Sequence, residues 1–338
     1  MIRCDVRPPR LPDLVSALLP RRGPALWNDP LCVPAHSGKA ALNHVFSYLR
    51  AVKILADKNS QILVPPWLGY WVYNAMRPHG FPVLHEGHDV KVAVVYHQYG
   101  FPQDLDEIQD ACARRGMVFI EDCAHALGGT YKGRPLGADG LAGIFSLSKF
   151  YPSLIGAAVR SEDPALRAHV SRLENSGSRV LGLFSFATKL LLQHPALAAT
   201  ESLTAGRLNE AAYAGYPYSR RLSWSGKITS LNGIRGELDA RRRHYRLYRE
   251  LLPGHEELQH LEPDVIPYVV PFMHPRREIL ERMAAALRAF GVDTGVYSFD
   301  ANRNLFNPRY APCLWLPVHG GLSEETIGRI AAVVKKEL

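Results

Sequence analysis

Two spacings of apolar residues alternate along the chain, and they predict helices that alternate with strands. From residue 37 onward, apolar positions recur every three or four residues in the segments expected to be helical, namely 38–55, 67–76 and 104–115. Between them lie short, continuous apolar runs, which are typical of strands buried on both faces of a sheet. The expected strands are 62–64, 82–84, 92–96, 117–120, 143–146 and 156–159.

Strands separated by helices favour a mostly parallel sheet with helices on both faces. In such sheets, ligands bind beyond the carboxyl ends of the strands. The residues that follow the expected strands should therefore meet at one edge of the sheet. They are Pro65, Pro66, His97, Asp122 and the segment from Ser146 to Lys149.

Beyond residue 159 the pattern becomes mainly helical. Helices are expected over 164–175, 181–192, 207–213, 231–252, 277–290 and 324–338, with a strand over 266–272. We therefore expect an N-terminal extension (1–32), a large α/β domain (33–240) and a smaller C-terminal α/β domain (241–338). The boundary between the two domains is expected within the long helix.

Composition narrows the class of protein. The chain has 338 residues, 47% of them hydrophobic, which is enough for a sizeable core. No apolar run is long enough to cross a bilayer, and the arginine- and proline-containing start lacks the features of a secretory signal, so we expect a cytoplasmic protein without a membrane partner. The five scattered cysteines form no CxxC pair, so we expect neither a structural metal nor disulfides.

The net charge of +8 comes from 40 basic and 32 acidic residues. The basic residues are spread out, apart from the run Arg241, Arg242 and Arg243 within an expected helix. We interpret that run as a solvated helix face and expect no nucleic-acid partner. A basic protein also suits an anionic small-molecule substrate.

Three local features carry candidate chemistry. Asp122 comes just after a buried strand. An aspartate at such a position either caps a helix or acts as the anion that holds a cofactor cation. Lys149 lies among apolar neighbours, which lower the pKa of a lysine and make it a nucleophile toward an aldehyde. Ser37, Gly38 and Lys39 open a helix, either as an ordinary serine cap or as a phosphate site.

The order of these features is a phosphate turn, a strand-end aspartate, and a lysine 27 residues later. It resembles the DegT–DnrJ–StrS sugar aminotransferases, a family of pyridoxal-phosphate (PLP) enzymes of fold type I. The resemblance extends from about Val33 to the C-terminus. It is closest in His97–Gln98–Tyr99–Gly100, in residues 104–115 and in residues 118–132. The closing segments 316–319 and 321–323 are also similar to the family pattern.

The resemblance implies a role for each matching position. Lys149 would hold PLP as a Schiff base and move protons, and Asp122 would pair with the pyridinium nitrogen. His125 would lie near the ring hydroxyl, and Ser146 would bind the phosphate together with the backbone of Gly38 and Lys39. An aromatic side chain, Trp67 or Tyr70, would stack on the cofactor ring. The active site would lie at the interface of a homodimer.

Two positions depart from the family pattern. The lysine follows Phe145 by four residues, whereas the family usually has it six residues after this phenylalanine, where this chain has Tyr151. The usual Asn-Tyr-Arg segment, which reaches the phosphate of the neighbouring subunit, is replaced by Ser225, Gly226 and Lys227. Lys227 would keep the positive charge without the planar fork of an arginine.

These features predict a transaminase that passes an amino group from a donor, glutamate, to a keto-sugar carried on a nucleotide. One alternative is a PLP enzyme of the same fold that acts on a non-sugar ketone. The reasons for it are the short lysine loop and the short segment between Val296 and Leu316, which helps to shape the sugar pocket in the family. The other is a non-catalytic paralogue that binds a ligand or a partner. The presence of both Lys149 and Asp122 argues against the last alternative.

Overall fold

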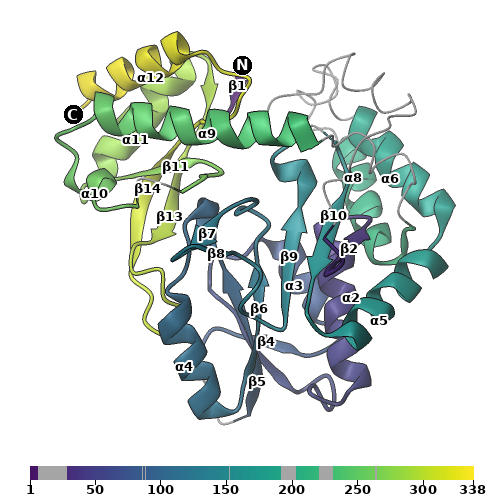
Figure 1. Ribbon diagram of the computed structural model, residues 1–338. Helices are drawn as coiled ribbons and strands as arrows, with labels where there is room; N and C mark the ends of the chain where they lie inside the picture. Colours follow the sequence, from purple (N-terminus) through teal and green to yellow (C-terminus); the bar gives the residue numbers. More distant parts are fainter. Residues whose placement is uncertain are drawn as a thin grey trace.

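The computed structural model describes residues 1–6, 29–85, 87, 89–151, 153–191, 203–220, 231–262 and 265–338. Its centre is a seven-stranded sheet with the order β2-β10-β9-β6-β5-β3-β4 (Figure 1). The strands are β2 (Cys32–Ala35), β3 (Gln61–Leu63), β4 (Phe81–Val83), β5 (Val90–Tyr96), β6 (Val118–Asp122), β9 (Ala142–Ser146) and β10 (Ala157–Arg160). The strands from β9 to β4 are parallel, and β10 runs antiparallel to both β9 and β2. The prediction of a mostly parallel α/β sheet is confirmed.

Both faces of this sheet are buried, which explains why the strands are continuous apolar runs. On β5, Val92 and Val94 pack in one hydrophobic cluster, whereas Ala93 and Val95 pack in the other. Successive side chains of a strand point to opposite faces, so both sets must be apolar. Helix α2 (Gly38–Ala51) covers the first face and α4 (Leu105–Arg115) the second.

A second sheet has the order β11-β14-β13 and is antiparallel. Its strands are β11 (Val270–Met273), β13 (Val296–Asp300) and β14 (Tyr310–Leu316), and it packs with helices α9 (Leu231–Leu251), α11 (Arg277–Ala289) and α12 (Glu324–Lys336). Strand β1 (Ile2–Arg3) pairs in parallel with β12 (Val292–Asp293). The first residues, expected to belong to a separate extension, therefore lie against the C-terminal part of the chain, and Figure 1 shows both termini there.

The strand expected over 266–272 begins only at Val270, so the prediction was wrong for 266–269. The backbone of those residues is engaged elsewhere. The N–H of Tyr268 donates to the carbonyl of Tyr99, and the guanidinium of Arg241 donates to the carbonyl of Tyr268. These bonds direct the segment toward the carboxyl edge of the large sheet.

Helices α5 (Pro164–Ser176), α6 (Arg179–Leu191) and α8 (Leu203–Gly215) follow the last strand of the large sheet. Helix α6 packs on α8, and the short 3-10 turn η3 (Tyr216–Tyr218) packs on α2. This arrangement brings Lys189, Tyr213 and Tyr216 to the start of α2. The remaining elements are α3 (Tyr70–Met76), α10 (Glu256–Gln259), β7 (Thr130–Tyr131), β8 (Arg134–Pro135), η1 (Gln98–Gly100) and η2 (Leu147–Lys149). Within the described ranges, no helix is both long and apolar enough to span a bilayer.

Candidate active site

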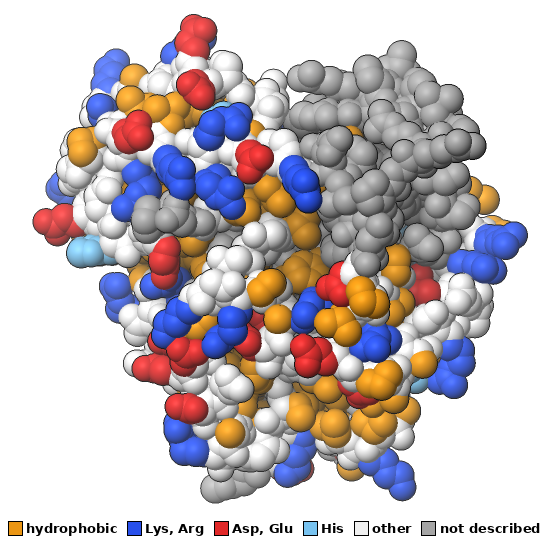
Figure 2. All heavy atoms as spheres, viewed as in Figure 1, with side chains coloured by type: hydrophobic (Ala, Val, Ile, Leu, Met, Phe, Trp, Pro, Cys, Tyr) orange, Lys and Arg blue, Asp and Glu red, His pale blue; other side chains and the backbone are white. Residues whose placement is uncertain are grey.

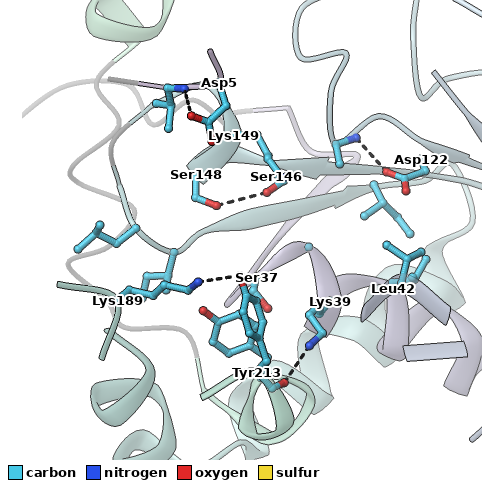
Figure 3. A pocket seen from close by; sticks show the side chains of 18 of the residues that line it. Asp5, Ser37, Lys39, Leu42, Asp122, Ser146, Ser148, Lys149, Lys189 and Tyr213 are labelled. Atoms are coloured by element: carbon cyan, nitrogen blue, oxygen red, sulfur yellow. Dashed lines mark hydrogen bonds between the residues drawn. The ribbon is translucent and has the colours of Figure 1, made fainter. Parts of the chain in front are cut away.

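A cavity of about 270 Å³ opens at the carboxyl edge of the parallel strands. A second cavity of about 470 Å³ adjoins it. The two share Val72, Asp122, Ala124 and Lys149, so they meet where the sequence places the candidate chemistry. Figure 3 shows the first cavity, with Asp122, Ser146, Lys149, Ser37 and Lys39 on its walls.

Asp122 is the last residue of β6 and is buried. Its Oδ1 accepts the N–H of Ala124 at 3.0 Å. Burial raises the pKa of this carboxyl group above its ordinary value, although the Ala124 N–H and the charges of His97 and Lys149 act in the opposite direction. A cation bound next to Asp122 would lower that pKa again, because it favours the charged form.

Lys149 reaches the cavity because the chain turns tightly after β9. Residues Leu147–Lys149 form a single 3-10 turn, and the N–H groups of Phe150 and Tyr151 both donate to the carbonyl of Leu147. The turn places the Lys149 side chain on the walls of both cavities, with its Nζ 5.5 Å from the centre of the Tyr268 ring. Tyr151, which occupies the usual lysine position of the family, packs instead against the hydrophobic core.

His125 lies flat against Tyr268, with ring centres 3.9 Å apart and planes inclined by 12°. The Tyr96 hydroxyl and Nδ1 of His125 form a hydrogen bond of 2.6 Å. Burial, reinforced by the charges of Lys149 and Arg241, lowers the pKa of the imidazole well below its ordinary value. His125 is therefore neutral and lines the second cavity as a polar but uncharged group.

The start of α2 forms the wall opposite Ser146. Ser37 caps the helix by accepting the N–H of Ala40, and it also lines the cavity. A Cβ on Gly38 would lie 3.5 Å from the Cβ of Ser146 and 3.7 Å from its Oγ, so glycine leaves open the space between the helix start and this hydroxyl. The first N–H groups of a helix lack acceptors within the helix and attract anions.

The two candidate aromatic residues occupy different positions. Trp67 is 56% exposed and lines the second cavity, whereas Tyr70 is 67% exposed, contacts Trp71 and lies on the wall of neither cavity. Val72, which lines both cavities, was not anticipated from the sequence. Lys227 lies outside the described residues, so its predicted phosphate contact remains a prediction.

The N-terminal strand brings two further residues to the cavity. Arg3 and Asp5 line it and form an ion pair with a distance of 2.9 Å. Burial raises the pKa of Asp5, but hydrogen bonding and charge from Arg3, together with the charge of Lys149, outweigh burial and leave this pKa below its ordinary value. No local motif in the sequence signals these residues, because contacts with distant parts of the chain position them.

Arg241 holds this arrangement together from α9. Its guanidinium donates to the carbonyls of Asp5 and Tyr268, each at 2.7 Å, and it pairs with Glu237. Its side chain is fully buried. The interpretation of the arginine run as a solvated face was therefore wrong for Arg241, whereas Arg243 is exposed. Helical spacing carries a signal of this burial, because Arg241 lies on the same face of α9 as the buried Tyr245 and Tyr248.

A buried hydrogen bond between His97 and Glu121 supports the end of β6. His97 donates through Nε2 to Glu121 at 3.0 Å and accepts the N–H of Gln103 through Nδ1. The Glu121 carboxylate also accepts the N–H groups of Gly137, Asp139 and Gly140. Cys123 lies beside this pair, and the three side chains offer close metal-ligating atoms. The hydrogen bonds of His97 and Glu121 give both a structural role next to Asp122.

Comparison with known proteins places this site in a family. The model of the DegT/DnrJ/EryC1/StrS aminotransferase family matches residues 88–335, well over half of the chain. The chain belongs to this family. The matched range contains Asp122, His125, Ser146, Lys149 and Lys227, so five of the proposed site residues lie within it.

Family members of described activity match over a shorter range. The L-glutamine:scyllo-inosose aminotransferase of Streptomyces griseus is 42% identical over 88 residues, which are 25% of this chain and 21% of that protein. The dTDP-3-amino-3,4,6-trideoxy-alpha-D-glucose transaminase of Streptomyces venezuelae is 38% identical over 89 residues, 25% of this chain and 23% of that protein. The chain therefore aligns with less than a quarter of the length of either relative.

Solved structures match over nearly the whole chain. The aminotransferase TlmJ from Streptoalloteichus hindustanus superimposes with a TM-score of 0.69 and 18% identity, covering 100% of this chain and 98% of that one. PseC of Helicobacter pylori, an aminotransferase involved in the biosynthesis of pseudoaminic acid, gives a TM-score of 0.69 and 15% identity, covering 99% and 98%. At these identities the likeness shows the shared fold.

Proposed function

We propose that this protein is a PLP-dependent aminotransferase that transfers an amino group from glutamate or glutamine to a keto-sugar. The observation that carries the proposal is the arrangement of Lys149 and Asp122 on one cavity whose far wall is the start of α2. The cavity that the start of α2 and Ser146 both line has room for a phosphate, and the buried Asp122 carboxyl fits a cationic ring nitrogen. The residues present therefore fit PLP.

Each of these residues has a distinct task in the proposed reaction. When bound, PLP supplies an aldehyde that amines attack and a ring that withdraws electrons. The Lys149 amine would hold the cofactor covalently and carry protons between the cofactor and the substrate, while the Asp122 carboxylate would keep the ring nitrogen protonated. The neutral His125 imidazole offers a hydrogen bond at the cofactor's edge. Ser146 and the N–H groups of Gly38 and Lys39 orient the phosphate.

The second cavity supports a sugar as the acceptor. It is lined by aromatic rings, and the stacked pair Tyr297 and Trp315 has ring centres 3.8 Å apart. The Trp315 indole N–H interacts with the Tyr99 hydroxyl, and both side chains line the cavity. Aromatic faces and a few convergent donors suit a ring that is apolar on its faces and polar at its edge. Arg277 adds a positive charge at the wall, which suits a phosphate-bearing substrate.

The names of the relatives support the same substrate class. One is a glutamine-dependent aminotransferase of an inosose, and the other is a transaminase named for a dTDP-linked amino sugar. A non-sugar ketone remains the second candidate, and a panel of keto substrates offered after the amino-donor half-reaction separates the two.

The first experiment is an absorption spectrum of the purified protein with added PLP, before and after borohydride. We expect a visible band in the wild type, covalent attachment of the cofactor to Lys149 after reduction, and neither in Lys149→Ala. Lys91→Ala is the matched control, because Lys91 pairs with Asp89 at an exposed position on β5 and lines neither cavity. A wild type without a band, or with the cofactor fixed on another lysine, would refute the proposal.

We also infer a cytoplasmic homodimer. Large apolar side chains such as Trp67 and Tyr70 are more than half exposed beside the second cavity, as expected of a surface that meets another subunit. All five cysteines are free, which suits a reducing compartment. Figure 2 shows lysine and arginine side chains interspersed with acidic ones on the face in view, a distribution unlike a continuous nucleic-acid-binding stripe. Light scattering coupled to size exclusion tests the dimer.

A further inference from the structure

Two lysines from distant parts of the chain converge on one tyrosine at the phosphate end of the first cavity. Lys39, in the first turn of α2, donates to the carbonyl of Tyr213 at 3.0 Å, and its Nζ lies 4.5 Å from the centre of the Tyr213 ring. Lys189, in α6, donates to the Tyr213 hydroxyl at 2.7 Å, and its Nζ lies 4.1 Å from the same ring centre. Figure 3 shows both lysines beside Tyr213, with Ser146 and Ser148 between them and Lys149 in this view.

Aromatic rings hold these ammonium groups in place. The Lys39 Nζ lies 4.1 Å from the centre of the Trp71 ring and 5.5 Å from that of Tyr216. Cation–π contacts of this kind stabilise an ammonium group without neutralising its charge. The two positive charges are therefore fixed in position before any ligand arrives.

The charges of this pair are not balanced within the described part of the chain. The hydrogen-bond partners of Lys39 and Lys189 there are a carbonyl, a hydroxyl and the side-chain amide of Asn209, and no carboxylate pairs with either lysine. Burial, together with the charge of Lys189, lowers the pKa of Lys39 to about 7. Two like charges held close together destabilise each other unless an anion lies between them.

The surrounding groups are suited to an anion. Lys39 and Lys189 line the cavity together with Gly38 and Ser146, which form the phosphate cradle. Tyr216 lines it too, and its hydroxyl is buried without a hydrogen-bond partner among the described residues. The acidic residues of this cavity, Asp5 and Asp122, both interact electrostatically with Lys149 and so belong to its end of the site.

We propose that Lys39 and Lys189 form a dianion-binding subsite that holds the phosphate monoester of the cofactor. The subsite supplies from within one chain the charge that the sequence resemblance assigned to Lys227. Its assignment to the cofactor rests on the proposed function, whereas its affinity for a dianion does not. A phosphate placed there would meet the helix start, the Ser146 hydroxyl and two ammonium groups, a set of donors that matches its charge and its three terminal oxygens.

The first test measures binding of inorganic sulfate to the cofactor-free full-length protein by calorimetry. The variants are Lys39→Met, Lys189→Met and the pair, with Lys91→Met as the matched control. Methionine preserves the length and apolar packing of the lysine stem, and circular dichroism with a melting curve verifies folding. We expect about a tenfold loss of sulfate affinity for each single variant, in line with the loss of one charge-assisted hydrogen bond, and no loss in the control. Arginine at either position should restore binding, which separates loss of charge from damage to the fold.

The second test compares PLP with pyridoxal, which lacks the phosphate. In the methionine variants PLP affinity should fall by the same factor as sulfate affinity, while pyridoxal affinity should remain at its wild-type value. Equal losses of affinity for PLP and for pyridoxal would overturn the assignment. It would also be overturned if PLP affinity is unchanged in Lys39→Met and Lys189→Met but falls in Lys227→Met. If the methionine variants lose affinity for a nucleoside diphosphate but bind PLP as the wild type does, the assignment is also overturned. The subsite would then bind the substrate and not the cofactor.

A third test uses pH, because sulfate keeps both charges between about pH 6 and about pH 9. Sulfate binding in the wild type should weaken as the pH rises through about 7, since Lys39 then loses its proton. The titratable side chains that face Lys39 are Lys189, Tyr213 and Tyr216. In Lys39→Arg the decline should disappear. An identical decline in that variant would contradict the role of Lys39.

Failure of this inference and failure of the proposed function give different results. If sulfate binding depends on the two lysines but PLP does not attach to Lys149, the anion subsite stands and the aminotransferase proposal falls. If PLP attaches to Lys149 and neither lysine affects sulfate or PLP, the aminotransferase proposal stands and the subsite falls.

Discussion

Replacement of Gly38 by alanine should separate the stability of the fold from the affinity of the cofactor. Gly38 is the first residue of α2, and an alanine Cβ there would make ordinary van der Waals contact with Ser146, at 3.5 Å from its Cβ and 3.7 Å from its Oγ. The fold therefore accommodates the methyl group without a clash. The same methyl group would narrow the cavity beside the helix start, where we place the phosphate.

The two effects have opposite signs. Alanine in place of glycine in a helix stabilises a protein by about 0.5 kcal/mol or more, because the unfolded chain has fewer conformations to lose. Displacement of the phosphate from the helix start and from Ser146 removes charge-assisted hydrogen bonds, each with a contribution of about 1.5–3 kcal/mol. Loss of about 3 kcal/mol in total corresponds to about a hundredfold weaker binding.

The assay combines urea unfolding of the cofactor-free protein with titration of PLP followed by absorbance. Gly328→Ala is the control, because Gly328 lies within α12 and nothing is within 4 Å of a Cβ built there. Both variants should be at least as stable as the wild type, but only Gly38→Ala should lose PLP affinity. Gly38→Ala with wild-type affinity would refute the placement of the phosphate. Equal loss of PLP affinity in both variants would refute the role of the cradle.

Two further predictions concern the buried groups that support the site. Glu121→Gln should lower the free energy of unfolding by about 3 kcal/mol, because the amide cannot replace a carboxylate that accepts three backbone N–H groups and pairs with His97. Burial raises the pKa of Glu121, but the His97 contact and the N–H donors outweigh it, so the net pKa is below 4.5. The difference in the free energy of unfolding between the wild type and Glu121→Gln, measured with urea, should therefore have its full value above about pH 5. It should shrink as the pH falls through this lowered pKa, and a difference that does not change with pH would contradict the reasoning. Arg241→Met should cost about 3 kcal/mol and detach the first residues, because the carbonyls of Asp5 and Tyr268 lose their donor. Hydrogen exchange should show faster exchange in residues 1–6 than in the wild type, and unchanged protection there would refute the role of Arg241.

Much of the site could be predicted because it follows local rules. Asp122 and Ser146 end buried parallel strands, and the carboxyl ends of such strands meet at one edge of the sheet. Ser37 is at the start of a helix whose apolar spacing is plain in the sequence. These positions depend on hydrophobic periodicity and on the order of strands, and both are encoded locally.

The sequence by itself determined the mostly parallel sheet, its buried strands, and the order of Gly38, Asp122 and Lys149 along the chain. Only the tertiary structure decided that Lys149, rather than Tyr151, reaches the cavity, because a single 3-10 turn sets the direction of the side chain. Long-range pairing brought Asp5 beside Lys149, and the packing of α6 on α8 brought Lys189 beside Lys39. Such contacts depend on how distant elements pack, and the periodicity of a single segment carries no record of its distant neighbours.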